Sequence, residues 1–394
     1  MRLKKIHVEK YCNLNHFEVE FNDSNVLILV GSNGCGKSNL FEVISQIVTA
    51  VFLQTNTDFK FRLDYQLKDK FVPLLNYSGN IRTNMVVGEG TISKKIFPRI
   101  LNEDLSPLLF DSLFIYYSGE NKRIYNLFKE DLEEEYKKEI NNEHLQNKKI
   151  NFLSFRHYPI IILVLLLYNP KFLKKIKIKD FTNLRIKLKK PKYRKKEYPT
   201  WDYIEPHFWG LSGYKKQFLQ ELYYLANNEK DTTVLYKEGN LDIKLFKDDL
   251  LKLKNKYKSE DFFKHFNNLI ILDMIKDIDF NLILEKDETI SYKELSEGEL
   301  QYIFILGFLS ICENKDYLFL LDEPETHLNP HWKLNYINEI KEILKDKPNI
   351  QAIINTPNPF GVYSGDTTVL SLNTKTSLAS KFPTKRGSCV FIIA

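Results

Sequence analysis

NVLILVGSNGCGKSNL, residues Asn25–Leu40, joins an apolar run, a glycine-rich segment and the start of an amphipathic segment. The apolar run Val26–Val30 is rich in branched aliphatic residues and bounded by polar ones, which predicts a buried strand. Gly31–Ser38 then fits G-x-x-x-x-G-K-[ST], the phosphate-binding loop (P-loop) pattern. Asn39–Val51 has the amphipathic character of the helix that must follow such a loop. A chance glycine-rich turn is the alternative, and the strand and helix on either side argue against it.

The loop predicts a nucleotide site in which the backbone and the side chains have separate roles. Its glycines let the backbone curl until N–H groups point at phosphate oxygens. Lys37 places a cation on the β- and γ-phosphates and so takes part in catalysis, while the Ser38 hydroxyl is a ligand for Mg²⁺. The positive end of the following helix adds to this attraction. The expected nucleotide-binding residues of this segment are Gly31, Ser32, Asn33, Gly34, Cys35, Gly36, Lys37, Ser38 and Asn39.

A second apolar run, Tyr317–Leu321, ends in two carboxylates, Asp322 and Glu323. Ligands of open α/β sheets bind at the carboxyl ends of the strands, so both side chains are expected beside the nucleotide. Asp322 is placed to hold Mg²⁺, directly or through water, and Glu323 to accept a proton from the attacking water. The alternative is that these acids only open a turn before Pro324.

Composition and length narrow the class of protein. The 394 residues suffice for two domains or one domain with a large insertion, and 43% hydrophobic with 27% charged residues is ordinary for a soluble globular protein. The cysteines have no metal-type spacing, which predicts reduced thiols in a cytoplasmic protein. The chain begins without an apolar signal core. The apolar run Pro159–Tyr168 is too short for a bilayer, so we expect a buried helix or strand and no membrane partner.

The net charge of +6 hides a strongly basic segment, Lys171–Lys196. That segment holds thirteen Lys and Arg residues and one acid, a charge of +12, which leaves about −6 on the rest of the chain. Alternation of Ile or Leu with Lys or Arg over Lys171–Lys190 predicts a strand with one cationic face. Such a face suits sequence-independent contact with nucleic acid, and the aromatic loop Pro191–Trp209 offers rings for base stacking. A solvated sheet face, an interface with an acidic partner and a local aromatic core are the alternatives.

The remaining pattern predicts alternating strands and helices without a sustained heptad repeat, and so no long coiled coil. Strands are expected at Arg2–Glu9, His16–Phe21, Phe59–Leu67, Asn80–Val87, Leu113–Tyr117, Asp279–Glu285, Thr289–Tyr292, Ile350–Ile354 and Val369–Leu372, and helices at Asn126–Lys149, Gln217–Asn227, Asp261–Lys276, Gln301–Cys312 and Trp332–Lys345. The apolar Cys389–Ala394 is consistent with an edge strand or with a longer native chain. His157, His207, His265 and His331 lack the neighbours of a metal site, and we expect none built by the protein.

Leu295–Glu299, LSEGE, resembles the signature motif of ABC-type ATPases. Ser296, Gly298 and Glu299 would lie at a helix N-terminus able to meet a γ-phosphate. Ser296 and Glu299 also have the spacing of a capping box, which is the structural alternative. The order of P-loop, signature and strand-Asp-Glu identifies the chain as similar to ABC-type ATPases.

The motifs GSNGCGKSN, LSEGELQ and LLDEPETHLNP, after an N-terminal hairpin, resemble the SMC/RecF/OLD branch of ABC ATPases, and within it the stand-alone ATPases of bacterial anti-phage and restriction-linked systems. The resemblance covers about residues 1–53 and 291–360. It implies an α/β P-loop NTPase head with a mixed sheet, an antiparallel β subdomain and a helical and β insertion. The ATPase core is expected at 1–57 and 278–394, and the β subdomain with the basic insertion at 58–277. The short remainder after residue 360 leaves no room for a Toprim domain.

The resemblance also implies a homodimer or higher oligomer with ATP and Mg²⁺ between the chains. Each site would combine Gly31–Ser38, Asp322 and Glu323 of one chain with Ser296 and Gly298 of another. Departures from the family pattern are Asn329 at the D-loop position, Pro357 where a histidine reaches the γ-phosphate, and a Q-loop position, Tyr117–Asn121, without glutamine. We therefore expect slow hydrolysis with binding and dimerisation intact.

The function that this resemblance implies is a regulatory or sensor ATPase of a DNA-linked or anti-phage defence system. Such a subunit controls a separate effector, a nuclease or a toxin. A RecF-like DNA-repair ATPase and a non-hydrolysing, ATP-dependent scaffold are the alternatives. No nuclease constellation is evident in the sequence.

Overall fold

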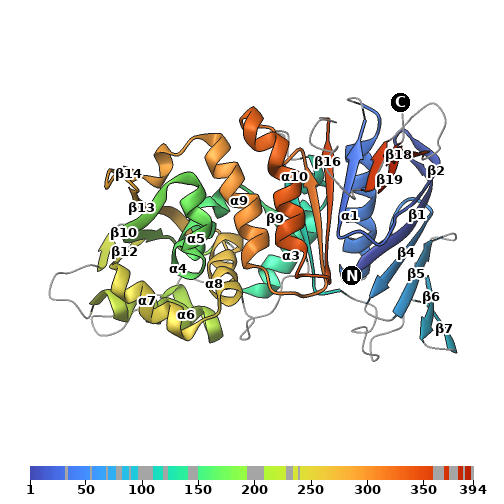
Figure 1. Ribbon diagram of the computed structural model, residues 1–394. Coiled ribbons are helices and arrows are strands. Elements are labelled where there is room, and N and C mark those ends of the chain that lie inside the picture. Colours follow the sequence, from blue (N-terminus) through green and yellow to red (C-terminus); the bar gives the residue numbers. More distant parts are fainter. Residues whose placement is uncertain are drawn as a thin grey trace. The chain divides into compact units, whose positions relative to one another are not determined.

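The computed structural model describes residues 1–31, 34–53, 56–67, 70–76, 82–87, 90–95, 110–118, 123–140, 150–192, 208–227, 234–237, 240–357, 368–371, 380–384 and 387–391. Its contacts divide the chain into two compact units (Figure 1). The first unit comprises Met1–Phe128, Lys148–Leu153 and Glu313–Ala394, and the second comprises Lys129–Asn147 and Ser154–Cys312. The boundaries expected from the motifs run differently, because residues 58–128 fall with the P-loop in the first unit and residues 278–312 fall in the second.

The first unit is built on a mixed eight-stranded sheet whose strands are parallel from β17 to β9. In spatial order the strands are β19 (Gly387–Phe391), β18 (Ser380–Thr384), β17 (Thr368–Ser371), β3 (Val26–Val30), β16 (Ile350–Thr356), β15 (Tyr317–Asp322), β8 (Ser112–Tyr117) and β9 (Ile150–Leu153). Every residue of β3, β15 and β16 is buried, as expected for parallel strands covered on both faces. The parallel strands end together, so Val30, Asp322 and Thr356 lie at one edge.

Helix α1 (Lys37–Leu53) lies between this sheet and a six-stranded antiparallel sheet, and α10 (Pro330–Leu344) lies on the other face (Figure 1). The antiparallel sheet has the order β2 (Leu14–Glu20), β1 (Arg2–Tyr11), β4 (Phe61–Leu67), β5 (Lys70–Asn76), β6 (Arg82–Val87) and β7 (Gly90–Lys95). The short helix α2 (Arg123–Leu127) follows β8. The predicted α/β class, with a mixed sheet and an antiparallel β subdomain, is confirmed.

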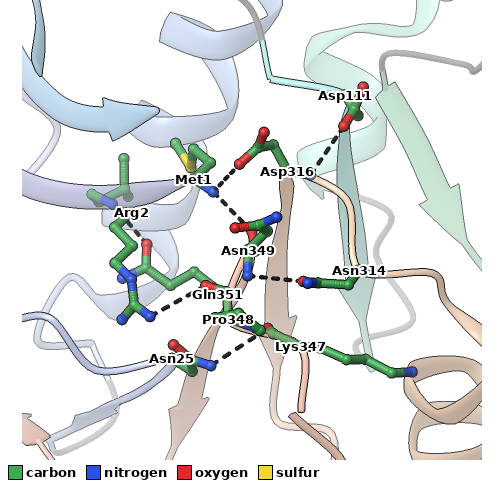
Figure 2. Close-up of polar contacts among 11 residues, drawn as sticks. Met1, Arg2, Asn25, Asp111, Asn314, Asp316, Lys347, Pro348, Asn349 and Gln351 are labelled. Atoms are coloured by element: carbon green, nitrogen blue, oxygen red, sulfur yellow. Dashed lines mark hydrogen bonds and ion pairs between the residues drawn. The ribbon is translucent and has the colours of Figure 1, made fainter. Parts of the chain in front are cut away.

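The amino ends of the parallel strands form a dense polar network (Figure 2). The α-amino group of Met1 donates to Asp316 Oδ1 at 2.6 Å and to the Asn349 carbonyl at 2.8 Å. The Asp316 N–H donates to Asp111 Oδ2 at 3.0 Å. Gln351, fully buried, accepts from the Leu3 N–H at 2.8 Å and donates to the Ser24 carbonyl at 3.3 Å. This edge of the sheet therefore joins β1, β15 and β16 through satisfied hydrogen bonds.

The second unit combines a five-stranded antiparallel sheet with helices. The sheet order is β11 (Val234–Lys237), β12 (Asn240–Leu245), β10 (Ile178–Leu188), β13 (Ile275–Leu284) and β14 (Thr289–Ser291), and the helices are α3 (Lys129–Glu139), α4 (Tyr158–Tyr168), α5 (Pro170–Leu173), α6 (Gly213–Asn227), α7 (Lys247–Lys256), α8 (Ser259–Ile271) and α9 (Glu297–Ile311). The apolar run expected as helix or strand is the buried helix α4. It packs on α9 so closely that a Cβ at Gly307 would lie 2.5 Å from Leu165 Cδ1. Within the described residues, no helix combines the length and the apolar character that crossing a bilayer requires.

Several predicted elements were wrong at their boundaries. The helix expected at Asn126–Lys149 is divided into α2 and α3, which end at Leu127 and Glu139, and residues 141–149 lie outside the described residues. Helix α6 begins at Gly213 rather than Gln217. The basic strand begins at Ile178 rather than Lys171, because helix α5 and a 3-10 turn (Lys174–Ile176) precede it and end at left-handed Lys177, with φ of 63°. Helix α8 ends at Ile271 and not at Lys276, because Asp273, with φ of 54°, turns the chain into β13. Helix α9 begins at Glu297 rather than Gln301, because Ser296 caps it. The edge strand expected near the C-terminus is β19.

Candidate nucleotide-binding site

The P-loop leaves β3 and enters α1 with two glycines in the left-handed region. Gly34 has φ of 82° and Gly36 has φ of 99°, which only glycine adopts without strain. Space at Gly36 is also tight, since a Cβ there would lie 2.8 Å from Asn13 Oδ1 and 3.2 Å from Leu14 Cδ2, and those side chains would have to shift to admit it. The turn of the β1–β2 hairpin therefore packs directly on the loop. Ser32 and Asn33 lie outside the described residues.

The side chain of Lys37 folds back across the loop and is held by a backbone carbonyl of the loop. Its side chain is 5% exposed, and its ammonium donates to the Gly31 carbonyl at 2.6 Å and lies 3.8 Å from Cys35 Sγ. The Leu40 N–H donates to the Gly36 carbonyl at 2.9 Å, which starts helix α1 at this point. The cation is thus fixed within the curl of the loop, where a phosphate would meet it.

Asp322 meets the P-loop at the end of β15. Its Oδ2 accepts from Ser38 Oγ at 3.4 Å, and its Oδ1 accepts from the Asn355 side-chain amide at the end of the neighbouring strand β16. Burial raises the pKa of Asp322 to about 6, and nearby Glu323 acts in the same direction. A hydroxyl and a carboxylate oxygen side by side are the hard donors that Mg²⁺ prefers, so these two residues fit that ion.

Glu323, the next residue, has a strained backbone. Its φ of 49° is in the left-handed region, which a glutamate adopts at a cost of about 1 kcal/mol or more. Its N–H donates to the Asn355 carbonyl at 2.8 Å, and its carbonyl accepts from Thr326 Oγ1 at 2.8 Å. These hydrogen bonds hold the strained backbone of Glu323 in place. We therefore infer that the fold sets the direction of the Glu323 side chain.

Glu325 and Thr356 form a contact that sequence reasoning missed. Thr356 Oγ1 donates to Glu325 Oε1, and both residues are buried. Among the described residues, Glu325 Oε2 has no hydrogen-bond partner. Burial raises the pKa of Glu325 to about 7. The pair joins the segment after Glu323 to the last residue of β16, just before Pro357.

The positions where the family pattern is broken have simple local structures. Pro357 is exposed directly after β16, and Asn358 lies outside the described residues. Asn329 is the N-cap of α10, where its side chain accepts from the Trp332 N–H at 2.9 Å, a role that Asn and Asp share. At the Q-loop position, the Ser118 N–H donates to the Asp322 carbonyl at 3.3 Å, and Gly119–Asn121 lie outside the described residues.

Asn39 and two further residues, Asn13 and Arg123, form a polar group beside the loop. Asn39 Nδ2 donates to Asn13 Oδ1 at 2.5 Å, and Arg123 Nη2 donates to Asn39 Oδ1 at 2.7 Å. Sequence reasoning placed Asn39 at the nucleotide and gave Asn13 and Arg123 no role. The only sequence signal was the position of Arg123 just after the Q-loop.

The signature residues lie in the second unit, at the N-terminus of α9. Ser296 is exposed; its backbone N–H and hydroxyl donate to Glu299 Oε2 at 2.9 and 2.7 Å, and the Glu299 N–H donates to Ser296 Oγ at 3.3 Å. The capping box weighed as the structural alternative is therefore present. Gly298 lies in the first turn of the same helix.

Several cations on β10 and directly after it are paired with carboxylates. Arg185 holds Asp242 of β12 with Nε and Nη2 at 2.8 and 2.6 Å, Lys179 holds Asp287 at 2.7 Å, and Lys189 holds Asp273 at 2.7 Å. These pairs favour the solvated-face interpretation over a free cationic surface. Of the loop aromatics, Phe208 and Trp209 are buried, in agreement with a local core, whereas Tyr193, Tyr198, Trp201 and Tyr203 lie outside the described residues, as does His207. No group of three His, Cys, Asp or Glu side chains in the described parts could hold a metal.

Residues 26–360 match the protein family described as "AAA domain, putative AbiEii toxin, Type IV TA system". None of the curated proteins compared with the sequence matches it. Among solved structures, the SMC head domain from Thermotoga maritima matches over 100% of both chains, with 10% identity and a TM-score of 0.39. The recombination mediator protein RecF, in a structure titled RecF-ATPrS, matches over 94% of this chain and 96% of its own, with 15% identity and a TM-score of 0.36. Likenesses at these levels say nothing about what this chain binds.

Proposed function

The chain belongs to this AAA-domain family, and on that premise we propose that it is an ABC-type ATPase of the SMC/RecF branch, which binds ATP with Mg²⁺ and hydrolyses it. The observation that carries the proposal is the approach of Ser38 Oγ to Asp322 Oδ2 at 3.4 Å. It brings the P-loop and the acidic end of β15 to one place, although the two segments are 284 residues apart. Few structural roles require a buried carboxylate beside a glycine-rich loop.

The residues divide the work as follows. Backbone N–H groups of the P-loop cradle the phosphates, and the Lys37 ammonium exchanges its bond to Gly31 for one to a phosphate oxygen. Ser38 and Asp322 would hold Mg²⁺, which neutralises charge on the β- and γ-phosphates. Glu323 accepts the proton of the attacking water, with its direction set by the strained backbone.

Turnover is expected to be slow. Related ATPases place a histidine at the position of Pro357, and proline has neither a side-chain donor nor a backbone N–H. One contact that stabilises charge in the transition state is therefore missing, and such contacts are worth roughly 3 kcal/mol, or 10²-fold in rate. A binding-only scaffold is the second candidate, and the same Pro357 favours it.

ATP is expected to join two chains, with exposed Ser296 and half-buried Gly298 at the N-terminus of α9 meeting the γ-phosphate bound by a second copy. Closure on ATP and release on hydrolysis then act as a switch. The family's link to a toxin system supports a regulatory role beside a separate effector, a nuclease or a toxin. A RecF-like role in DNA repair is the alternative.

Contact with nucleic acid through Lys171–Lys196 would compete with ion pairs inside the chain, in which Arg185, Lys179 and Lys189 are engaged. Lys171, Lys174, Lys177 and Lys190 are exposed. Replacing these four with Gln should weaken DNA binding and flatten its salt dependence if the segment holds DNA. Equal binding and slope in the variant and the wild type would assign it to another role.

The oligomeric state tests the proposal. Light scattering with a slowly hydrolysed ATP analogue and Mg²⁺ should show a doubled mass for wild type and no change for Lys37→Ala or Ser296→Arg. Ser291→Arg is the matched control, because Ser291 forms the same capping box with Glu294 outside the signature. An unchanged wild-type mass would refute the shared site.

A further inference from the structure

A line of hydrogen bonds runs from helix α2 to the P-loop. Arg123 Nη2 donates to Asn39 Oδ1 at 2.7 Å, Asn39 Nδ2 donates to Asn13 Oδ1 at 2.5 Å, and Asn13 Nδ2 donates to the Gly34 carbonyl at 3.1 Å. We infer that Arg123 is a positioning residue of the nucleotide site, acting on the loop through Asn39 and Asn13. The inference rests on the proposed function, since the loop must bind a nucleotide.

The line has a fixed direction because arginine has donors and no acceptor. Asn39 must turn its amide oxygen toward Arg123, which turns its NH₂ group toward Asn13. Asn13 in turn must present its oxygen to Asn39 and its NH₂ group to Gly34. Without Arg123, both amides are free to rotate by half a turn, and the last bond to the loop is then lost.

The last hydrogen bond of this line fixes the orientation of the Gly34–Cys35 peptide in the P-loop. In a trans peptide the N–H points opposite to the C=O, so holding the Gly34 carbonyl fixes the direction of the Cys35 N–H. The same Asn13 side chain lies close to Gly36, since a Cβ added there would be 2.8 Å from Asn13 Oδ1. Asn13 therefore contacts the loop at both of its left-handed glycines.

Arg123 is itself anchored by a buried carboxylate of α1. Its Nε lies 2.6 Å from Glu42 Oε1 and its Nη2 lies 3.2 Å from Oε2, and the Glu42 side chain is 2% exposed. Tyr11 donates to the same Oε2 at 2.9 Å and accepts from Gln46 at 2.7 Å. Burial raises the pKa of Tyr11, which keeps it a donor. The guanidinium plane is thus held from one side while its Nη2 reaches Asn39.

Two roles for Arg123 have to be separated. A merely structural arginine would only neutralise buried Glu42, and a positioning arginine would also orient Asn39. The variant Arg123→Ala leaves buried Glu42 without its cationic partner, which is destabilising by itself. Adding Glu42→Gln removes that charge while the line to Gly34 stays broken.

Isothermal titration with ATP and Mg²⁺ measures the outcome. We expect Arg123→Ala to weaken ATP binding about tenfold, Arg123→Ala/Glu42→Gln to remain equally weak, and Asn13→Ala added to Arg123→Ala to have little further effect. Arg62→Ala is the matched control, because Arg62 pairs on β4 with Asp64 at 2.9 Å in a similar setting, with side chains 43% and 4% exposed. It should bind ATP like wild type.

Recovery of wild-type affinity on adding Glu42→Gln would overturn the inference and assign Arg123 to charge balance alone. So would wild-type affinity in Arg123→Ala itself. Arg123→Lys, which keeps the charge but not the planar fork, should fold and still bind ATP more weakly than wild type. Absence of ATP binding in the wild type would refute the proposed function instead, and with it the premise of this inference.

Discussion

The buried polar groups at the amino ends of the central parallel strands differ from those at their carboxyl ends, here called the amino edge and the carboxyl edge. At the amino edge, Asp316 before β15 and Gln351 in β16 are buried, and the Met1 α-amino group and backbone groups satisfy them (Figure 2). At the carboxyl edge, Asp322 and Glu325 are also buried, but burial raises the pKa of each carboxyl group. Glu323 between them has a left-handed backbone.

The difference separates residues that stabilise the fold from residues kept for chemistry. A buried carboxylate with an ammonium partner adds little when intact but is costly to break. Crowded carboxyl groups and a strained residue lower stability, and they persist where function needs them. Mutations at the amino edge should therefore lower stability, whereas mutations at the carboxyl edge should change activity and can raise stability.

Asp316→Ala gives the largest expected effect on stability. Removing one member of a buried pair leaves the Met1 ammonium without its partner, and such changes destabilise by roughly 3–5 kcal/mol. Urea unfolding should show this loss, while the ATP affinity of the folded fraction stays at the wild-type value. Asp23→Ala is the control, because Asp23 pairs with Lys4 and is 77% exposed, so its loss should be within about 0.5 kcal/mol. Equal losses in the two variants would remove the distinction.

Glu325→Gln should raise stability, where Asp316→Ala lowers it. Because burial raises the pKa of Glu325 from 4.5 to about 7, the folded state binds this proton more tightly than the unfolded chain. Its contribution to stability is full below about pH 4.5 and is lost as the pH rises through 7, a change of about 3 kcal/mol. The variant should therefore be more stable than wild type at pH 8, and its advantage should shrink toward pH 5. Parallel pH profiles from urea unfolding would contradict this.

Pro357→His tests the missing contact at the carboxyl edge with a smaller expected effect. If the new imidazole reaches the γ-phosphate, single-turnover hydrolysis should rise by at least about tenfold, toward the roughly 10²-fold that such a contact is worth, with ATP affinity and stability little changed. A wild-type protein that already turns over several ATP per second without a partner would show that no contact is missing.

The local motifs account for what the sequence predicted well. The P-loop, the strand ending in Asp322 and the cap at Ser296 each lie within a few consecutive residues. A local sequence pattern therefore includes every residue that forms the feature. The apolar run Tyr317–Leu321 likewise indicates a buried strand. These features led directly to the α/β class, which the structure confirms, and to the candidate nucleotide site, which stays a prediction.

Long-range contacts account for what it did not predict. Thr356 meets Glu325 from 31 residues away, and Arg123 meets Asn39 from 84 residues away, with no local pattern in either case. The alternation over Lys171–Lys190 predicted one strand, but left-handed Lys177 separates a 3-10 turn from β10 within it. Helix α9 packs closely against α4 because Gly307, which has no side chain, leaves room for Leu165. No sequence motif reveals this packing.

The most direct test of the central claim is ATP binding and single-turnover hydrolysis measured on one preparation of Glu323→Gln beside wild type. Glutamine keeps the size and the backbone contacts of residue 323 but is a far weaker proton acceptor. The account predicts ATP affinity within about threefold of wild type and hydrolysis slowed by ~10²-fold or more. Hydrolysis by Glu323→Gln at the wild-type rate would contradict it, because the general base would then be another group.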